Sequence, residues 1–272
     1  MSLGHGASIV RDGLVLHLDA ANVKSYSGSG TTWNDLSGNG NDGALVNSVG
    51  YSTNSNGVLS FDGVNDHINL GNSSELSSIG GTTNITASAW VYYNDYGGGA
   101  QGYSVITVKG SPWTWLLENF QQTFRFRITA GGSDVNVPDT STHELNKWYC
   151  VSGTYDGATM NIYVNGDLKA FKSQTGSLAT NSVTARIGTF QGTNYNLNGN
   201  ISDVKIYNRA LTAQEIKQNF EALRGRYNIS RFYDTLPNII DGGSSQNNNI
   251  TSLNPASSAP NSVSTIIDGG SS

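Results

Sequence analysis

The stretch that decides the fold runs from Arg186 to Ile216 and reads RIGTFQGTNYNLNGNISDVKIYNRALTAQEI. It predicts a short strand, a polar loop rich in Gly and Asn, a second strand and the start of a helix. In the second strand, Ile201, Val204 and Ile206 place apolar side chains between polar ones. Such a strand buries one face, so we expect it to lie in the core of a β-rich domain.

The helix that follows is expected from about Ala213 to Arg224. Thr212 lies three residues before Glu215, which is the spacing of a capping box, in which two side chains satisfy free N–H groups of the first turn. Apolar residues recur at helical spacing, which predicts one buried stripe. The stripe consists of Ile216, Phe220 and Leu223.

This stretch resembles the closing segment of the laminin-G-like, concanavalin-A-like jelly-roll domains, which reads G-x-I-D-E-V-x-I-Y-N-R-A-L-x-x-x-E-I. The acidic pair of the family is replaced here by Ser202 and Asp203. The matching residues are Gly199, Ile201, Val204, Ile206, Tyr207, Asn208, Arg209, Ala210, Leu211, Glu215 and Ile216.

Three further motifs extend the resemblance to about residues 13–220. A loop containing WNDLSGNGNDG and the following FDGVNDHI are similar to two early motifs of the family, with His67 where Tyr is usual. The segment from Trp148 to Gly166 is similar to its W-x-x-V-x-x-T-Y-D-G-x-x-x-x-x-Y-V-N-G meander. The resemblance implies an all-β fold, a two-sheet antiparallel jelly-roll sandwich with a short C-terminal helix and extended arms. It is weak evidence for function, because one fold hosts many functions.

Composition agrees with an all-β protein. Among 272 residues there are 33 Gly and 13 Tyr, and only 13% are charged. The net charge is −5 and no basic block occurs, so nucleic acid is not an expected partner. No apolar run has the length of a membrane span, so insertion into a membrane is not expected either. Cys150 is the single cysteine, which excludes an internal disulfide framework.

The chain is expected to have three parts: an N-terminal arm at residues 1–12, the sandwich at 13–226 and a C-terminal arm at 227–272. Residues 22–57 are interpreted as loop. Asp156-Gly157 and Asn165-Gly166 predict type I′ hairpin turns, since both dipeptides suit positive backbone angles. The remaining strands are expected at 13–19, 58–61, 85–93, 103–109, 113–117 and 123–129.

Catalysis in this fold would require paired carboxylates beside a glycosidic bond. Hydrolases on the same sandwich carry E-x-D-x-x-E along one strand, and this triplet does not occur here. Glu118 stands alone after its strand. We therefore expect a protein that is not an enzyme, with a glycosidase as the least favoured alternative.

One structural calcium ion is a candidate cofactor, because hard cations bind clustered carboxylate and carbonyl oxygens. The expected ligands are Asp62 and Asp66, with Asp203 approaching from the last strand. The competing interpretation is that these side chains only cap turns.

A glycan site would combine exposed aromatic rings with amides and hydroxyls. Trp113 and Trp115 are also considered, and at least one of them is expected in the core. Tyr96 and Tyr195, in polar Gly-rich loops, are the preferred surface rings. The predicted ligand-binding residues are Tyr93, Asn94, Asp95, Tyr96, Gln191, Asn194 and Tyr195.

The C-terminal arm repeats the phrase IIDGGSS, at 239–245 and at 266–272. Each copy offers a short apolar strand and a turn that could add to the edge of a neighbouring sheet. The arm is therefore predicted to bind other copies of the chain or virion subunits. The predicted assembly residues are Ile239, Ile240, Asp241, Ile266, Ile267 and Asp268.

The N-terminus lacks the apolar core of a secretory signal. Together with the repeated tail, this favours a phage virion protein, made in the host cytoplasm, such as a head decoration or tail-fibre component with a lectin-like domain that binds host-surface glycan. The alternative is an extracellular, secreted or cell-surface, carbohydrate-binding adhesin.

Overall fold

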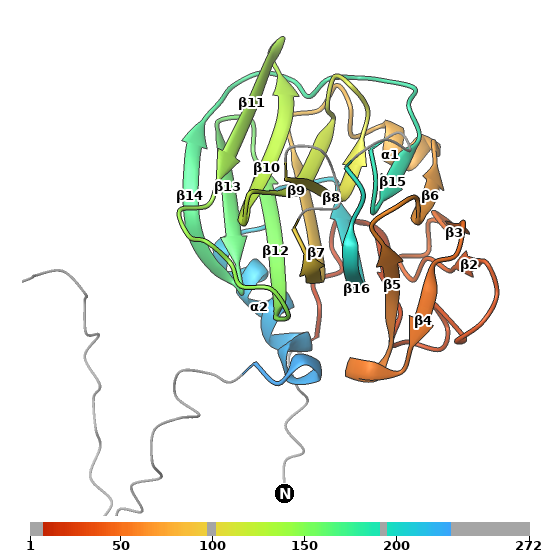
Figure 1. The fold of residues 1–272 in the computed structure, drawn as a ribbon. Coiled ribbons are helices and arrows are strands. Elements are labelled where there is room, and N and C mark those ends of the chain that lie inside the picture. The colour runs from red at the N-terminus through yellow and green to blue at the C-terminus, as the bar shows by residue number, and fades with distance from the viewer. Residues whose placement is uncertain (1–7, 97–101, 191–194, 230–272) are drawn as a thin grey trace, which may run out of the picture. The chain divides into compact units, whose positions relative to one another are not determined.

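The computed structural model describes residues 8–96, 102–190 and 195–229. The chain divides into a unit of residues 1–231 and a unit of residues 232–272, and the described residues all belong to the first. That unit contains two antiparallel sheets packed face to face (Figure 1). The predicted all-β sandwich with a short C-terminal helix is confirmed.

Sheet A contains the second strand of the stretch Arg186–Ile216, whereas the first strand of that stretch, β15 (Ala185–Ile187), belongs to sheet B. Strand β16 of sheet A lies next to β7, and β16 pairs with β5 through its first half and with β1 through its second half. The strands are, in order, β14 (Asp167–Ser173), β13 (Thr159–Val164), β12 (Trp148–Tyr155), β7 (Ile85–Asp95), β16 (Asn198–Tyr207), β5 (Val58–Asp62) and β4 (Gly50–Ser52), with β1 (Leu14–Asp19) on β16.

Sheet B is the opposite layer. Its strands are, in order, β11 (Ser133–Pro138), β10 (Thr123–Ala130), β9 (Trp115–Phe120), β8 (Tyr103–Lys109), β15 (Ala185–Ile187), β6 (His67–Gly71), β3 (Gly43–Val46) and β2 (Thr32–Trp33). The helical segments of the described residues are η1 (Asn54–Asn56), α1 (Ser74–Ser77), α2 (Ala213–Leu223) and η2 (Arg224–Tyr227).

The core fills the space between the sheets with alternate residues of each strand. In β10, Phe124, Phe126 and Ile128 are fully buried, while the arginines between them face outward. Gly153 on β12 faces the ring of Phe126, and a Cβ at this position would lie 2.2 Å from that ring. A side chain here would therefore push the two sheets apart.

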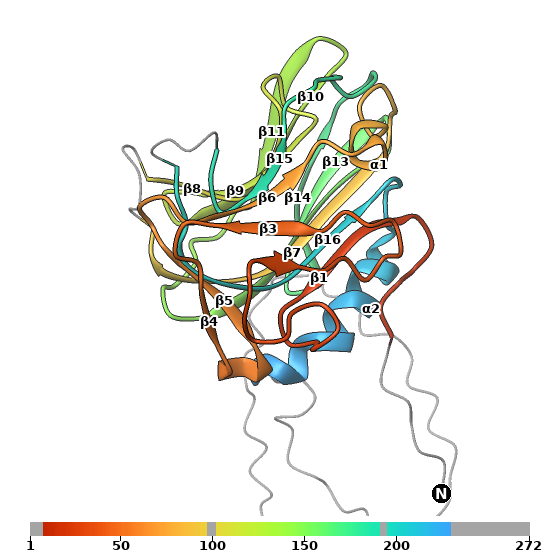
Figure 2. The ribbon, with the colours of Figure 1, turned by 90° about the vertical axis from the view of Figure 1, so that its right-hand side faces the viewer.

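Helix α2 packs on the outer face of sheet A, at the lower end of the sandwich (Figures 1 and 2). The predicted capping box is present, with Thr212 and Glu215 each accepting a hydrogen bond from the other's backbone N–H. The apolar stripe of α2 contacts Trp90 and Cys150 on sheet A. The predicted stripe of Ile216, Phe220 and Leu223 is buried, and this prediction is confirmed.

The sandwich domain extends past both of its predicted boundaries. Val10 is buried: its N–H donates to Asn219 Oδ1 at 2.8 Å, and its C=O accepts from the Tyr207 hydroxyl at 2.9 Å. Tyr227 is buried against Trp90, with ring centroids 4.0 Å apart. The domain therefore includes residues 8–12 and reaches past the boundary expected at 226. The repeated phrase IIDGGSS lies outside the described residues.

Three local predictions need correction. Residues 22–57 contain β2, β3, β4 and η1. These strands are short and polar and have no alternating pattern of their own, because they are held by hydrogen bonds to partner strands. Strand β11 was not predicted, and β9 is displaced from 113–117 to 115–120. Asn165 and Gly166 both have positive φ, as a type I′ turn requires, but at Asp156-Gly157 only the glycine does. There Asp156 Oδ1 accepts from two backbone N–H groups of a longer turn.

Candidate ligand-binding site

The outer face of sheet B carries a pocket of about 160 Å³. It forms because β8 and β9 have apolar residues on both faces: Ile106 and Leu117 point into the core, while Val105 and Leu116 point outward. Phe190 and Tyr195, which come between β15 and β16, lie on this outer face, and the Val105 N–H donates to the Tyr195 C=O at 3.1 Å. The pocket is lined by Tyr103, Val105, Trp113, Leu116, Glu118, Arg127, Phe190 and Tyr195.

Four half-buried aromatic rings form the wall of the pocket. Trp113 and Phe190 meet edge to face with centroids 4.7 Å apart, and Tyr103 and Tyr195 do so at 5.2 Å. Phe190 and Tyr195 join the two pairs at 6.3 Å. Such an arrangement fixes each ring by contact with its neighbours and leaves ring surface for a ligand.

Two arginines hold the charges around the pocket. Arg125 Nη2 lies 2.6 Å from Glu118 Oε1, and Arg127 binds both carboxylate oxygens of Asp134, at 2.8 and 2.5 Å. The Arg127 guanidinium also lies over the Trp113 ring, 5.4 Å from its centroid. Burial raises the pKa of Glu118, and the positive charge of Arg125 acts against that shift.

Of the predicted ligand-binding residues, Tyr195 lines this pocket, while Gln191 and Asn194 lie outside the described residues. Trp113 also lines it, and Trp115 is fully buried in the core, so the expectation that at least one of the two is core is confirmed.

Tyr93 and Tyr96 were predicted as ligand-binding residues, and Tyr96 also as a surface ring, but both side chains are buried. Their exposed fractions are 1% and 8%. Tyr93 packs on Phe124, and the Tyr96 hydroxyl donates to the His143 C=O at 2.6 Å. Asn94 and Asp95 are exposed near the end of β7, on sheet A, and so do not belong to the same site as Tyr195.

Tyr103, Phe190 and Arg127 are site residues that the sequence analysis did not select. The sequence contains a signal for Tyr103. Strand 103–109 has apolar residues on both faces, whereas a strand with one face in water would have polar residues on that face. Phe190 stands in a polar loop, and its position could not be derived before that loop was placed on sheet B.

Of the three predicted calcium ligands, Asp62 and Asp66 lie together, with the Asp62 N–H donating to Asp66 Oδ2 at 3.2 Å, but Asp203 lies apart from them. Asp62 pairs with Asn198 on β16, and Asp203 lies five residues further along that strand, so roughly 15 Å separates them. Asp62 Oδ1 accepts from the N–H of Val64 at 2.8 Å, and Asp66 Oδ1 accepts from the N–H of Ser48 at 2.9 Å. Asp62 thus caps its own turn and Asp66 joins that turn to the loop at Ser48, which agrees with the competing interpretation that these side chains hold turns. A calcium ion at Asp62 and Asp66 stays a prediction.

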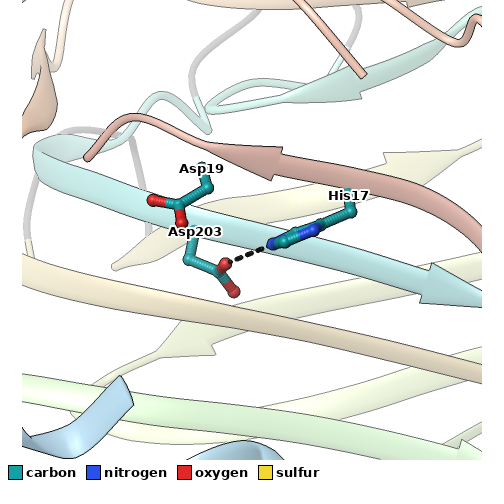
Figure 3. Close-up of side chains that lie close together, drawn as sticks. All are labelled: His17, Asp19 and Asp203. Atoms are coloured by element: carbon teal, nitrogen blue, oxygen red, sulfur yellow. Dashed lines mark hydrogen bonds and ion pairs between the residues drawn. The ribbon is translucent and has the colours of Figure 1, made fainter. Parts of the chain in front are cut away.

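Asp203 belongs instead to a buried cluster with His17 and Asp19 (Figure 3). Among the described residues this is the one group of three side chains whose ligand atoms all lie within 4.8 Å of one another. His17 Nε2 is 3.1 Å from Asp203 Oδ2, and Lys205 Nζ donates to Asp203 Oδ1. Arg226 Nη1 lies 2.8 Å from Asp19 Oδ1. Two cations therefore already balance the two carboxylates, which argues for a structural network rather than a metal centre.

A family model described as the concanavalin A-like lectin/glucanases superfamily matches residues 61–217. This is more than half of the chain, which therefore belongs to that family. The sequence matches none of the curated proteins. None of the described helices is long and apolar enough to cross a membrane.

Several solved structures share the fold. The binding domain of Paraclostridial Mosquitocidal Protein 1 is 18% identical, with a TM-score of 0.63 over 77% of this chain and 52% of that chain. The binding domain of botulinum neurotoxin DC in complex with rat synaptotagmin II is 17% identical, with a TM-score of 0.62 over 79% and 52%. A Trypanosoma rangeli sialidase is 19% identical, with a TM-score of 0.61 over 84% and 36%. The chain thus spans about half the length of the toxin binding domains, and at these identities the likeness concerns the fold.

Proposed function

We propose that this protein is a non-enzymatic, carbohydrate-binding domain that mediates adhesion to a surface, and that it holds a sugar ring in the pocket on the outer face of sheet B. The observation that carries the proposal is the wall of four aromatic rings around a small cavity with polar groups. The rings offer flat apolar faces for stacking, and Arg127 and Glu118 offer hydrogen bonds to hydroxyl groups. Ligand pockets for drug-sized molecules measure roughly 300–1,000 Å³, so a cavity of 160 Å³ suits one ring-sized group.

A glycosidase is less well supported. Hydrolysis of a glycosidic bond generally uses two carboxyl groups on either side of the bond. Of the residues that line the pocket in the described part of the chain, Glu118 alone carries a carboxylate, and it is paired with Arg125. The nearby Asp134 is bound at both oxygens by Arg127. The likeness to a sialidase concerns the fold and does not supply the missing acid.

Two settings remain for this activity. A virion surface, as a head decoration or tail-fibre component, is favoured by the repeated phrase in residues 230–272, because that phrase suits contacts with further copies or subunits. A secreted or cell-surface adhesin is the alternative. Two of the solved structures with this fold are binding domains of toxins, which supports attachment to a cell-surface partner in either setting.

Replacing Trp113 by Ala tests the proposed site. A glycan array identifies a ligand for the wild type, and titration calorimetry measures its affinity. Loss of one stacking ring is expected to weaken binding about five- to tenfold. Phe171→Ala is the matched control, because Phe171 is 69% exposed on the edge strand β14, away from the pocket, and should leave affinity unchanged.

Three results would count against the proposal: an array without any bound glycan, equal affinity of wild type and Trp113→Ala, or release of reducing ends that disappears in Glu118→Gln. The last result would identify an enzyme.

A further inference from the structure

The outer face of sheet A is covered only in part. Tyr227 and Phe220, from η2 and α2, lie on Trp90 of β7 with ring centroids 4.0 and 5.6 Å away. Two residues further along β7, Tyr92 points to the same face but is only half-buried, and Asn94 is exposed. Along β7 the helical cover therefore ends between Trp90 and Tyr92, while on β12 Tyr227 also contacts Trp148, with ring centroids 4.7 Å apart.

Beyond this point, four partly exposed side chains form one row across four strands. Ser60 on β5 is opposite Asn200 on β16, Asn200 is opposite Tyr92 on β7, and Tyr92 is opposite Trp148 on β12. Neighbouring strands lie about 4.8 Å apart, so the row is roughly 14 Å long. This length suits several linked rings rather than one.

The row is the floor of a groove of about 340 Å³. The end of β4 and the helical turn η1 form one side, through Ser52, Asn54 and Ser55. Among the described residues, none of the side chains that line the groove is charged. The groove therefore provides hydroxyls, amides and two aromatic rings, and no ionic partner.

Each end of the row offers a different interaction. Tyr92 and Trp148 lie with ring centroids 5.5 Å apart and planes inclined by 52°, so both present apolar ring surface to the groove. At the other end, the Ser60 hydroxyl donates to Asn200 Oδ1 at 2.6 Å. That bond orients the Asn200 amide and leaves its nitrogen to donate to a hydroxyl group of a ligand.

We propose that this groove is a second binding site, and that its ligand is a neutral oligosaccharide, a chain of sugar rings without carboxylate or sulfate groups. The aromatic pair stacks on one ring, and the amides and hydroxyls along the row bind hydroxyl groups of the next rings. The absence of charge in the lining favours this ligand over an acidic glycan, which would lose its hydration without gaining a cation. The site differs in face and in chemistry from the pocket on sheet B, which contains Glu118 and Arg127.

Titration calorimetry with the full chain tests the site, with cellohexaose, laminarihexaose, xylohexaose and mannohexaose as neutral probes and trigalacturonate as the acidic probe. We expect at least one neutral hexaose to bind the wild type. Tyr92→Ala should weaken that binding about tenfold, while Tyr92→Phe, which keeps the ring, should stay within about twofold. Asn200→Ala is a second variant that leaves both rings in place and should also weaken binding.

The matched control is Phe171→Ala, which removes an exposed ring on the edge strand β14, outside the groove, and should leave the affinity for the neutral hexaose unchanged. Trp113→Ala is measured beside it and reports on the pocket on sheet B, so that either site can fail while the other holds. The inference is overturned if no neutral hexaose binds, if Tyr92→Ala binds as well as the wild type while remaining folded, or if trigalacturonate binds in the same groove. A native mass that falls in Tyr92→Ala would instead assign the groove to a contact between two copies of the chain, and would overturn it too.

Discussion

Asp203 is a fully buried carboxylate on β16 that stays charged. Burial alone would raise its pKa, but Lys205 and His17 more than offset this and lower the pKa to about 2 from its usual 3.8. A group whose pKa is depressed by folding stabilises the protein at pH values above its usual pKa. The contribution of Asp203 is therefore complete above about pH 4 and is lost as the pH falls through 2.

Asp203→Asn is expected to destabilise the fold by about 3–5 kcal/mol at pH 7, because it leaves the buried Lys205 without its counter-charge. Urea unfolding measured from pH 7 to pH 2 checks this. In the wild type, stability should decrease by about 2 kcal/mol across the acid range from this one group, and the variant should lack that decrease. The control is Glu144→Gln, which removes an exposed ion pair with Lys147 and should cost less than about 1 kcal/mol. Equal losses in both variants would contradict the prediction.

At the scale of elements, η2 fixes the end of the domain through one ring. Tyr227 stacks on Trp90 and also contacts Trp148, with 4.7 Å between the ring centroids of Tyr227 and Trp148. The buried hydroxyl of Tyr227 has no hydrogen-bond partner among the described residues. The ring, not the hydroxyl, is therefore expected to provide the stabilisation.

Tyr227→Ala should cost about 3 kcal/mol, as the removal of a large buried ring does, and Tyr227→Phe should change stability by less than about 0.5 kcal/mol. The free energy of unfolding in urea measures both changes. If the domain truly ended at residue 226, as the sequence analysis expects, Tyr227→Ala would have no effect.

The sequence predicts long strands well for a physical reason. Residues 103–109 were predicted with the observed bounds, and 85–93 differs from β7 by two residues, because long runs of β-branched, aromatic and other apolar residues indicate a strand from the segment itself. The two-residue strand β2 and the three-residue strand β4 have no such pattern, since their pairing depends on β3 and β5.

Site residues were harder to predict than strands. In the sequence, Tyr195 and Tyr96 both stand among polar residues and glycines, so both were expected at the surface. In the structure Tyr195 lines the pocket, whereas Tyr96 packs on Tyr93 in the core. The pocket joins β8, β9, β10 and the loop after β15, which are far apart in the sequence. Such a site exists only once the register of sheet B is set, so a pattern within one segment cannot indicate it.

For the whole molecule, the two proposed sites lie on the outer faces of opposite sheets, which point away from each other. One copy could therefore hold two glycans, but it could not place both sites on one flat surface. Strong attachment to a surface would require several copies that present the same face together. The repeated phrase in the C-terminal residues is the predicted means of that assembly.

The last prediction concerns this assembly. Replacing Ile239, Ile240, Ile266 and Ile267 by Ser removes the apolar positions of both copies of IIDGGSS, so the native mass should fall to that of one chain, 28.9 kDa. Affinity for a soluble glycan should not change, because the sandwich is intact. Binding to a glycan-coated surface should weaken by about 10²–10⁴, since linked sites add avidity without new contacts. Leu253→Ser is the control within the same segment. If the wild type already has the mass of one chain, or if the fourfold variant keeps a larger mass, the phrase does not mediate assembly.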